Sequence, residues 1–219
     1  LLMLVSGYSG IGKSSLIHEI NKPILKERGY FASGKYDQLV RNIPYSAIIA
    51  AVQDLLRQVL TEPTERVEVW KTALLRAFGG EGRVLTDVIP ELEYVIGPQP
   101  EPEAVTPAEA ENRINTLFRA LLKVFAAKEH PLVLFLDDLQ WADAASLALL
   151  ERVLADHSLR YLMIIGAYRD NEVGPSHLLS LSLEAVRKNG ATIRDIVLKP
   201  LMEETAALLV GDTLSSPGA

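Results

Sequence analysis

A glycine-rich segment near the start of the chain carries residue types that together bind phosphate. Residues 7–14 fill the pattern G-x-x-x-x-G-K-[ST] directly after the apolar run 1–5. Glycine has no Cβ, so backbone N–H groups here can approach phosphate oxygens closely. A helix beginning near Lys13 would aim its free amides at these oxygens, with Lys13 on the outer phosphates and Ser14 on Mg²⁺. The expected nucleotide-binding residues are Gly7, Tyr8, Ser9, Gly10, Ile11, Gly12, Lys13, Ser14 and Ser15.

Two neighbouring acids follow another strongly apolar segment and could hold the metal ion that a bound triphosphate requires. Asp137 and Asp138 come directly after residues 132–136. Side chains of adjacent strand residues diverge, so Asp137 can bind Mg²⁺ while Asp138 faces an attacking water. The alternative is that both acids cap the following turn. The pattern predicts Ser14 and Asp137 as metal ligands and Asp138 as a catalytic residue.

Arg169 follows the apolar segment 161–167 and should emerge at the same edge of the sheet as the phosphates. An arginine that reaches the γ-phosphate stabilises the transferring charge, an effect of about 10³ to 10⁵ in rate for arginine fingers. A surface ion pair with Asp170 or Glu172, worth under about 1 kcal/mol, is the alternative. We expect Arg169 to join Lys13 and Asp138 as a catalytic residue.

We expect mainly structural roles for the residues in the turn after the two acids. Asp143 has the position and side chain of a helix N-cap, and Trp141 should pack against the turn. Gln140 either senses the terminal phosphate or is an exposed polar residue. Residues at the end of the second predicted strand and in the loop after it are more often solvated than nucleotide-sensing; they are Lys35, Asp37, Gln38, Arg41 and Tyr45. None of the four histidines, His18, His130, His157 and His177, has metal-ligand spacing.

The elements that must position these residues alternate between strand and helix. Apolar segments predict strands, and apolar residues at helical spacing predict helices. The expected strands are 1–5, 30–36, 132–136, 161–167 and 192–198. The expected helices are 15–28, kinked or restarted near Pro23, then 46–60, 65–78, short pieces between 82 and 96, 107–128 with Thr106 as N-cap, 144–154, 176–188 and one from 203. Such alternation predicts an α/β fold with a parallel sheet covered on both faces and ligands at the carboxyl ends of the strands.

Composition excludes several classes of function. The chain has 219 residues, 48% of them hydrophobic and 23% charged, which are values of a folded protein. Its formal charge of −6 disfavours nucleic acid or an anionic membrane as a partner. The absence of cysteine excludes thiolate metal sites and favours a reducing compartment, so the cytoplasm is expected. No apolar run approaches the roughly 20 residues that span a bilayer.

Four segments resemble one known group, the STAND-type signalling ATPases of the AAA-like P-loop class. Residues 7–15, residues 33–38 with 41–46, residues 132–143 and residues 166–173 are similar to blocks in the ATPase module of bacterial multi-domain sensor kinases, both Ser/Thr and histidine kinases. The glycine loop alone is shared by many nucleotide-binding proteins. The Leu-Asp-Asp-Leu-Gln-Trp-Ala-Asp and Tyr-Arg-Asp-Asn-Glu-Val blocks are much narrower, so the four segments together are fairly specific.

The resemblance implies a three-layer P-loop fold with strand order 5-1-4-3-2, ATP and Mg²⁺ as ligands, and slow hydrolysis that switches a signalling chain. Asp138 stands where many AAA relatives have the longer glutamate, which implies slow turnover. Residues 1–200 would be the ATPase core, with 97–107 an exposed linker loop inside it, and 201–219 would start a truncated helical lid. The chain is expected to be a piece of a larger protein that carries kinase, GAF and histidine-kinase domains and self-associates with ATP.

Three alternatives stay open at this point. The domain could bind ATP or ADP without appreciable hydrolysis and serve as a scaffold for partners. It could be a small-molecule kinase, which requires an acceptor pocket and usually an arginine-rich lid. It could also be an AAA-type DNA-associated ATPase of the replication-initiator kind, whose basic lobe would lie outside this sequence.

Overall fold

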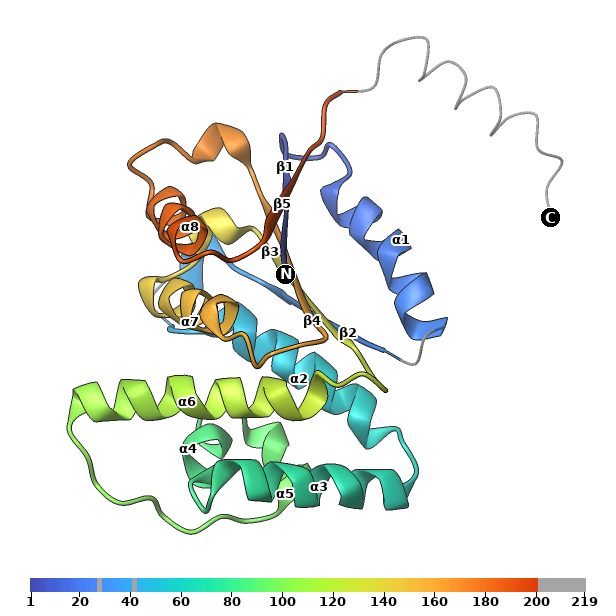
Figure 1. The fold of residues 1–219 in the computed structure, drawn as a ribbon, viewed down its shortest axis with the longest axis vertical. Coiled ribbons are helices and arrows are strands. Elements are labelled where there is room, and N and C mark those ends of the chain that lie inside the picture. The colour runs from blue at the N-terminus through green and yellow to red at the C-terminus, as the bar shows by residue number, and fades with distance from the viewer. Residues whose placement is uncertain (27–28, 41–42, 201–219) are drawn as a thin grey trace, which may run out of the picture.

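Five parallel strands form the centre of the computed structural model, which describes residues 1–26, 29–40 and 43–200 (Figure 1). The strands are β1 (Leu2–Ser6), β2 (Tyr30–Lys35), β3 (Leu132–Asp137), β4 (Leu162–Tyr168) and β5 (Ile193–Val197). They pair in the order β2-β3-β4-β1-β5. The predicted α/β class and the strand order 5-1-4-3-2 are confirmed.

The helices follow the predicted periodic segments closely. They are α1 (Lys13–Lys26), α2 (Ser46–Leu60), α3 (Thr64–Phe78), α4 (Gly82–Thr86), α5 (Glu93–Ile96), α6 (Pro107–Phe125), α7 (Ala144–Ala155) and α8 (Leu178–Lys188). Short 3₁₀ turns are η1 (Gln38–Val40), η2 (Pro90–Leu92), η3 (Leu139–Trp141) and η4 (Asp170–Glu172). The backbone of α1 continues through Pro23 without the predicted restart. The predicted lid helix from 203 lies outside the described residues.

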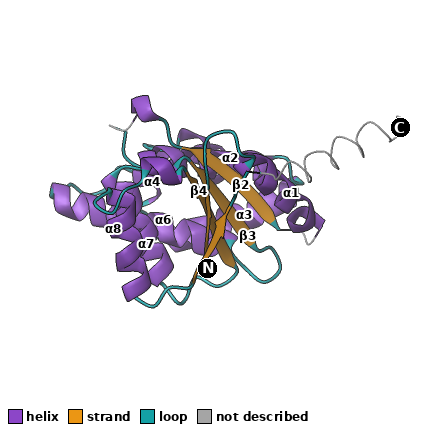
Figure 2. Cartoon of the chain, turned by 90° about the horizontal axis from the view of Figure 1, so that it is seen from above, coloured by secondary structure: helices purple, strands orange, loops and turns teal. Residues whose placement is uncertain are grey.

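Alternate strand residues pack into two different cores. Val5, Phe135 and Ile165 contact the apolar side of α1 around Ile17. Their neighbours in sequence, such as Leu4 and Leu134, face the larger core on the opposite side of the sheet. Figure 2 shows α1 on one side of the strands and α7 and α8 on the other. This period of two explains why the strands are apolar on both faces.

The larger core extends into a helical layer formed by α3 to α6, which lies against α2 (Figure 1). Residues 97–106 form neither helix nor strand and lead into α6. Thr106 caps that helix as predicted, because its side chain accepts from Glu109 N while the Glu109 carboxylate accepts from Thr106 N at 2.9 Å. Within the described part of the chain, no helix has both the length and the apolar character needed to cross a membrane.

Strand β2 lies at one edge of the sheet, where α2 covers it at close range. A Cβ on Gly34 would lie 1.8 Å from the carbonyl oxygen of Ala47, so only glycine allows this approach. The side chains of α2 also pair with the outer edge of β2: Asp54 Oδ2 accepts from Ser33 N at 3.0 Å and Gln58 Nε2 donates to Phe31 O at 2.7 Å. The edge is thereby protected from pairing with another strand. The same contacts hold the end of β2 beside β3.

Candidate nucleotide-binding site

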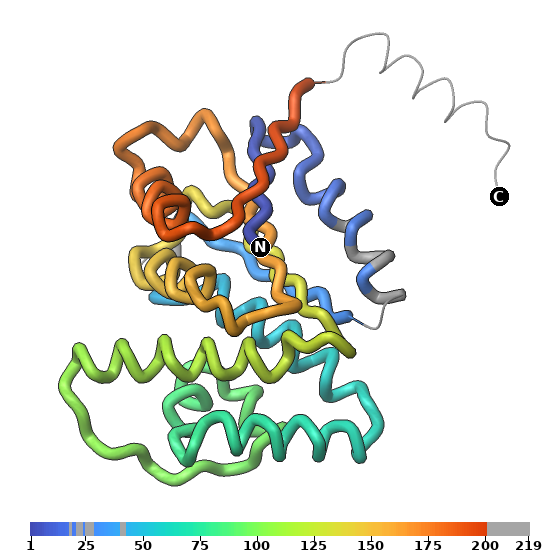
Figure 3. The backbone as a smooth tube through the Cα atoms, viewed as in Figure 1, coloured from blue at the N-terminus to red at the C-terminus, as the bar shows by residue number. Residues whose placement is uncertain are grey.

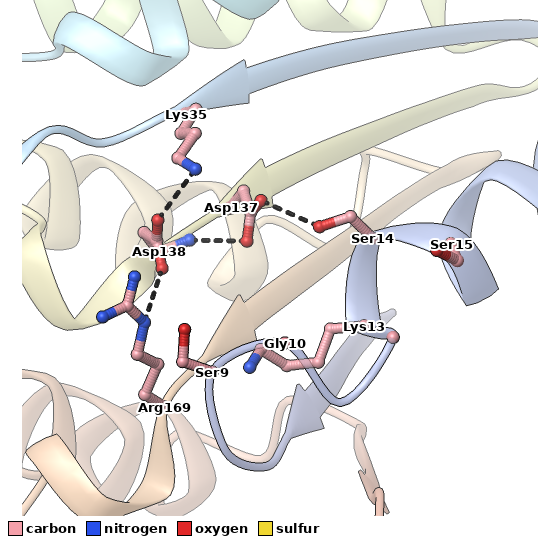
Figure 4. Close-up of a pocket in the computed structure, with 10 residues that line it drawn as sticks. Ser9, Gly10, Lys13, Ser14, Ser15, Lys35, Asp137, Asp138 and Arg169 are labelled. Carbon is pink, nitrogen blue, oxygen red and sulfur yellow. Dashed lines mark hydrogen bonds and ion pairs between the residues drawn. The ribbon is translucent and has the colours of Figure 1, made fainter.

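The carboxyl ends of four strands meet around one cavity of about 270 Å³ (Figure 4). Parallel strands place these ends at a single edge, and Lys35 on β2 is directly in register with Asp137 on β3. Strand β5 ends beside the glycine loop, where Leu198 N donates to Ser6 O at 2.8 Å (Figure 3). The residues that line the cavity are Ser9, Gly10, Gly12, Lys13, Ser14, Ser15, Lys35, Asp137, Asp138 and Arg169.

Most of the predicted nucleotide-binding residues therefore line this cavity, and three do not. Gly7 packs against Leu198, where a Cβ would lie 2.9 Å from the Leu198 carbonyl oxygen. Tyr8 is exposed to solvent and Ile11 is half-buried beside the loop. These three belong to the loop but do not line the cavity, so their part in binding a nucleotide stays a prediction.

The glycine loop has the backbone conformation that its sequence predicts. Gly10 and Gly12 have φ values of 77° and 99°, in the left-handed region that favours glycine. Helix α1 then begins at Lys13. The first N–H groups of a helix have no partner within the helix, and they point out of its amino end. The loop and the helix start thus present amide donors to the cavity, as an anion site requires.

Lys13 lies on the inner side of this loop. Its Nζ donates to the carbonyl oxygens of Gly7 at 2.7 Å and Tyr8 at 2.8 Å. Burial lowers the pKa of the Lys13 ammonium, and the charges of Asp137 and Asp138 oppose that shift. An ammonium group has three donors, so Lys13 can keep these contacts and still donate to a phosphate.

The two predicted metal ligands are in direct contact. Ser14 Oγ donates to Asp137 Oδ2 at 3.2 Å, although 123 positions separate them in the chain. The second oxygen of Asp137 accepts from Asp138 N at 2.9 Å, which fixes the carboxylate plane. Hydroxyl and carboxylate oxygens are the hard ligands that Mg²⁺ prefers, and Mg²⁺ commonly takes its remaining ligands from water and phosphate. The residues present fit that ion, and no cluster of three or more His, Cys, Asp or Glu suited to a metal occurs among the described residues.

Asp138 is buried beside this pair and is held from three elements. Its backbone φ of 54° lies in the left-handed region, which is uncommon for a residue other than glycine. Oδ2 pairs with Lys35 Nζ at 3.2 Å, and Oδ1 pairs with Arg169 Nε at 3.5 Å. Oδ1 also accepts from Gln140 Nε2 at 2.8 Å. These donors fix the positions of both carboxylate oxygens at the cavity wall.

Arg169 makes the ion pair that was the alternative to a sensor role, and it also lines the cavity. Its Nη1 pairs with Glu172 at 2.8 Å, as the ion-pair alternative predicts. Its Nε nevertheless faces Asp138 across the cavity, and its guanidinium lies 4.8 Å from the centre of the Trp141 ring. Trp141 is half-buried and packs against the core, as expected for this turn. Arg169 therefore lies at the cavity, and its role as a γ-phosphate sensor stays a prediction.

Gln140 and Lys35 are the residues whose importance the sequence pattern understated. Gln140 is only 2% exposed, so its interpretation as an exposed turn residue is wrong. Lys35, the last residue of β2, has a solvated side chain as expected, yet it pairs with Asp138. The register of Lys35 with Asp137 would have indicated this, but register is not visible in the sequence. Arg41 lies outside the described residues.

Asp143 is the N-cap that its position predicts, and it also connects the site to α2. One oxygen accepts from Ser146 N at 2.8 Å, at the start of α7. The other accepts from Tyr45 N at 3.2 Å, just before α2. Three of the four histidines have described side chains. His130 contacts the carbonyl of Phe125 and His177 caps α8, so neither lies at the cavity.

Comparison with known proteins begins with a family model described as the AAA ATPase domain, which matches residues 1–165. That range holds the glycine loop, Lys35, both acids and Gln140, and it ends within β4. Arg169 lies four residues beyond the match.

Curated relatives include several histidine kinases of eukaryotes. Hybrid signal transduction histidine kinase G of Dictyostelium discoideum is 40% identical over 153 residues, which are 69% of this chain and 4% of that protein. Histidine protein kinase 1 of Candida albicans is 24% identical over 167 residues, covering 70% of this chain and 7% of that protein. Peroxide stress-activated histidine kinase mak2 of Schizosaccharomyces pombe is 26% identical over 185 residues, covering 75% and 8%. The chain thus spans less than a tenth of these relatives.

Solved structures give weaker likenesses. A Walker-type ATPase of Pyrococcus abyssi has a TM-score of 0.44 and 16% identity, covering all of this chain and 55% of that one. A structure of Drosophila ORC bound to DNA has a TM-score of 0.40 and 13% identity, covering 94% and 86%.

Proposed function

The chain belongs to the AAA ATPase domain family, and on that premise we propose that it binds ATP with Mg²⁺ and hydrolyses it slowly as a switch module of a larger signal-transduction protein. The observation that carries this proposal is the contact between Ser14 and Asp137 at the mouth of the glycine loop. It brings the two oxygen donors of a magnesium site together beside the amides and lysine of a phosphate site.

Phosphate binding rests on Lys13 and the loop amides. The amides supply directed donors, and the ammonium supplies the charge that β- and γ-phosphate oxygens require. Ser14 and Asp137 would hold the metal ion, which neutralises charge between those phosphates when bound. Arg169 is close enough to the cavity for its guanidinium to turn from Asp138 toward a terminal phosphate.

Hydrolysis rests on Asp138, and its surroundings support a slow rate. To orient a water, the carboxylate must present an oxygen to the cavity. Oδ1 is engaged by Gln140 and Arg169, and Oδ2 is engaged by Lys35. A water must therefore compete with a lysine for Oδ2, and the aspartate side chain is also one methylene shorter than glutamate. Turnover is limited by how often the cations leave the carboxylate.

The histidine kinases among the relatives support a place in a sensor kinase. The parent protein would carry kinase and GAF domains, and its ATPase module would change arrangement between ATP and ADP, with self-association as one readout. The STAND assignment and a bacterial type of kinase rest on the motif blocks, since the relatives above come from eukaryotes. The cytoplasm remains the proposed compartment because the sequence has no cysteine.

A paired measurement of binding and turnover in the full-length protein tests the proposal. Isothermal titration should show ATP binding that requires Mg²⁺. Asp138→Asn should keep that affinity within about threefold and lose about 10² to 10⁴ in turnover, the usual contribution of a general base. Asp195→Asn is a matched control, because Asp195 lies on β5 and pairs with Arg187 of α8, and neither residue lines the cavity. Absence of magnesium-dependent binding would overturn the whole proposal, whereas equal turnover in Asp138→Asn would remove only the role of Asp138.

A nucleotide-dependent scaffold without hydrolysis is the second candidate. It is favoured by one observation, that both oxygens of Asp138 already have protein partners. Magnesium-dependent binding of ATP with no detectable turnover in the unchanged protein would decide for this candidate.

A further inference from the structure

The side-chain amide of Gln140 makes hydrogen bonds to Asp138 and to Arg169, in addition to being buried. Resting on the proposed function, we propose that Gln140 is a positioning residue that holds Oδ1 of Asp138 so that Oδ2 is presented to the attacking water. Gln140 does not line the cavity, and it would act only through Asp138.

The amide of Gln140 joins the end of β3 to the end of β4. Its Nε2 donates to Asp138 Oδ1 at 2.8 Å, and its Oε1 accepts from Arg169 N at 3.2 Å. A carboxylate can only accept here and a backbone N–H can only donate, so the two partners fix the orientation of the amide. Both ends of the side chain are used, and rotation of the amide would break both contacts at once.

Burial separates Gln140 from the two cations that share Asp138. Gln140 is 2% exposed, whereas the side chains of Lys35 and Arg169 are 64% and 25% exposed. An exposed lysine is held weakly and can turn toward an incoming phosphate. Once Lys35 and Arg169 turn away, the Gln140 contact still holds Oδ1, and Oδ2 is open to a water. Gln140 is thus the fixed partner and the cations are the exchangeable ones.

The turn that carries Gln140 is itself fastened to β4. Leu139 packs so tightly over Gly166 that a Cβ there would lie 2.2 Å from Leu139 Cδ1. Trp141 N donates to Asp138 O at 2.9 Å and closes the turn. The left-handed backbone of Asp138 sets the direction of its side chain, and the hydrogen bond from Gln140 holds the carboxylate in that orientation. The position of the Asp138 side chain at the cavity therefore depends on the η3 turn as much as on β3.

Gln140→Glu in the full-length protein tests this directly. Glutamate keeps the shape and the acceptor for Arg169 N but places a second carboxylate against Asp138. The Nε2 donor that holds Asp138 Oδ1 is thereby replaced by an acceptor, so the contact that positions the Asp138 carboxylate is lost. We expect affinity for Mg²⁺ and ATP to stay within about threefold. We expect kcat at pH 7 to fall at least about tenfold while that affinity is kept, a split that a general loss of structure would not give.

Gln53→Glu is the matched control. Gln53 Nε2 donates to the Glu91 carboxylate at 3.0 and 3.1 Å, on the side of α2 that faces η2. Gln53→Glu therefore makes the same change of charge against a carboxylate away from the cavity, and its kcat and its affinity for ATP should match those of the unchanged protein.

Three outcomes would overturn the proposal. One is an unchanged kcat in Gln140→Glu, and another is an equal loss of affinity for ATP and of kcat, as a merely structural role would give. If Gln140→Glu does not fold, Gln140→Leu replaces it, and unchanged kcat in that variant is the third. Turnover of Asp138→Asn, measured in the same experiment, distinguishes failure of this inference from failure of the proposed role of Asp138. If it loses turnover while the Gln140 variants do not, only this inference fails; if it keeps turnover, the role of Asp138 fails first.

Discussion

Glu62 and Asp138 are acids near opposite ends of the same sheet, and their surroundings differ in one respect. Asp138 lies at the carboxyl end of β3, where two of its partners are cations that border a cavity. Glu62 lies near the start of β2, where Tyr30 Oη, Trp70 Nε1 and Arg66 Nε all donate to it. We call these the open end and the closed end of the sheet. At the closed end the protein supplies every group, whereas at the open end a ligand can replace some of them.

The packing around Glu62 explains why the closed end is structural. The Trp70 ring lies 4.9 Å from Phe125 and 4.8 Å from His130, and Tyr30 packs edge-on to all three. Burial alone would raise the pKa of Glu62, but hydrogen bonds from Tyr30, Trp70 and Arg66 hold it below its ordinary value. The ionised carboxylate is thus half-buried beside the aromatic cluster, where hydrogen bonds hold it in place. Changes here should affect folding, and changes at the open end should affect chemistry.

The largest expected effect is at the open end. Lys13→Ala removes the charge that faces the phosphates, so turnover should fall by about 10² to 10³, as loss of one preorganised donor does. The circular dichroism spectrum should be unchanged, because the loop carbonyls that Lys13 contacts can bind water. Lys71→Ala, which removes an exposed pair with Glu68 on α3, is the control. Full turnover in Lys13→Ala would break the distinction between the two ends.

The closed end should show the reverse pattern. Glu62→Ala leaves the donors of Tyr30 and Trp70 without their acceptor, which should lower the free energy of unfolding by about 2–3 kcal/mol. Urea denaturation measures this loss, and ATP turnover should not change at a temperature where the variant is folded. Glu68→Ala, at an exposed position, should be nearly neutral. A loss of turnover with stability intact would place a function at the closed end.

A third prediction uses pH at the same end of the sheet. Hydrogen bonds from Arg119 and Ser158 lower the pKa of Asp156 to about 2 from an ordinary value of 3.8. Because the folded-state pKa is the lower one, this carboxylate stabilises the fold above about pH 5 and loses that effect as pH falls toward 2. Asp156→Asn should therefore cost about 1–2 kcal/mol at pH 7 and progressively less below pH 4. Urea titrations at several pH values would show a constant difference if the Arg119 contact were unimportant.

The smallest expected effect is at the start of α6. Thr106→Ala removes the capping box with Glu109, so the free energy of unfolding should fall by about 1 kcal/mol. Thermal denaturation of Thr106→Ala beside Thr116→Ala, a mid-helix change, measures the cap alone. Equal melting temperatures in the two variants would show that the cap adds nothing, and turnover should be the same in both.

Local patterns were enough to predict most elements and most of the residues that line the cavity. Helical spacing of apolar residues located α2, α3 and α7 to within a residue, because it records which face of each helix is buried. The glycine loop and the acids after β3 were placed at one edge because the carboxyl ends of parallel strands meet there. Strand order came from the resemblance of the motif blocks, since spacing alone does not say which strands are neighbours.

Residue types and their periods in the chain therefore determined the elements, the glycine loop and the carboxylate beside Ser14. Only the tertiary structure decided that Lys35 reaches Asp138, that Gln140 is buried between Asp138 and Arg169, and that Glu62 is enclosed by Tyr30 and Trp70. Those contacts depend on strand register, on one left-handed residue and on how closely Gly34 and Gly166 let neighbouring elements approach. Such distances are set by the packing of segments far apart in the chain, which a local pattern does not contain.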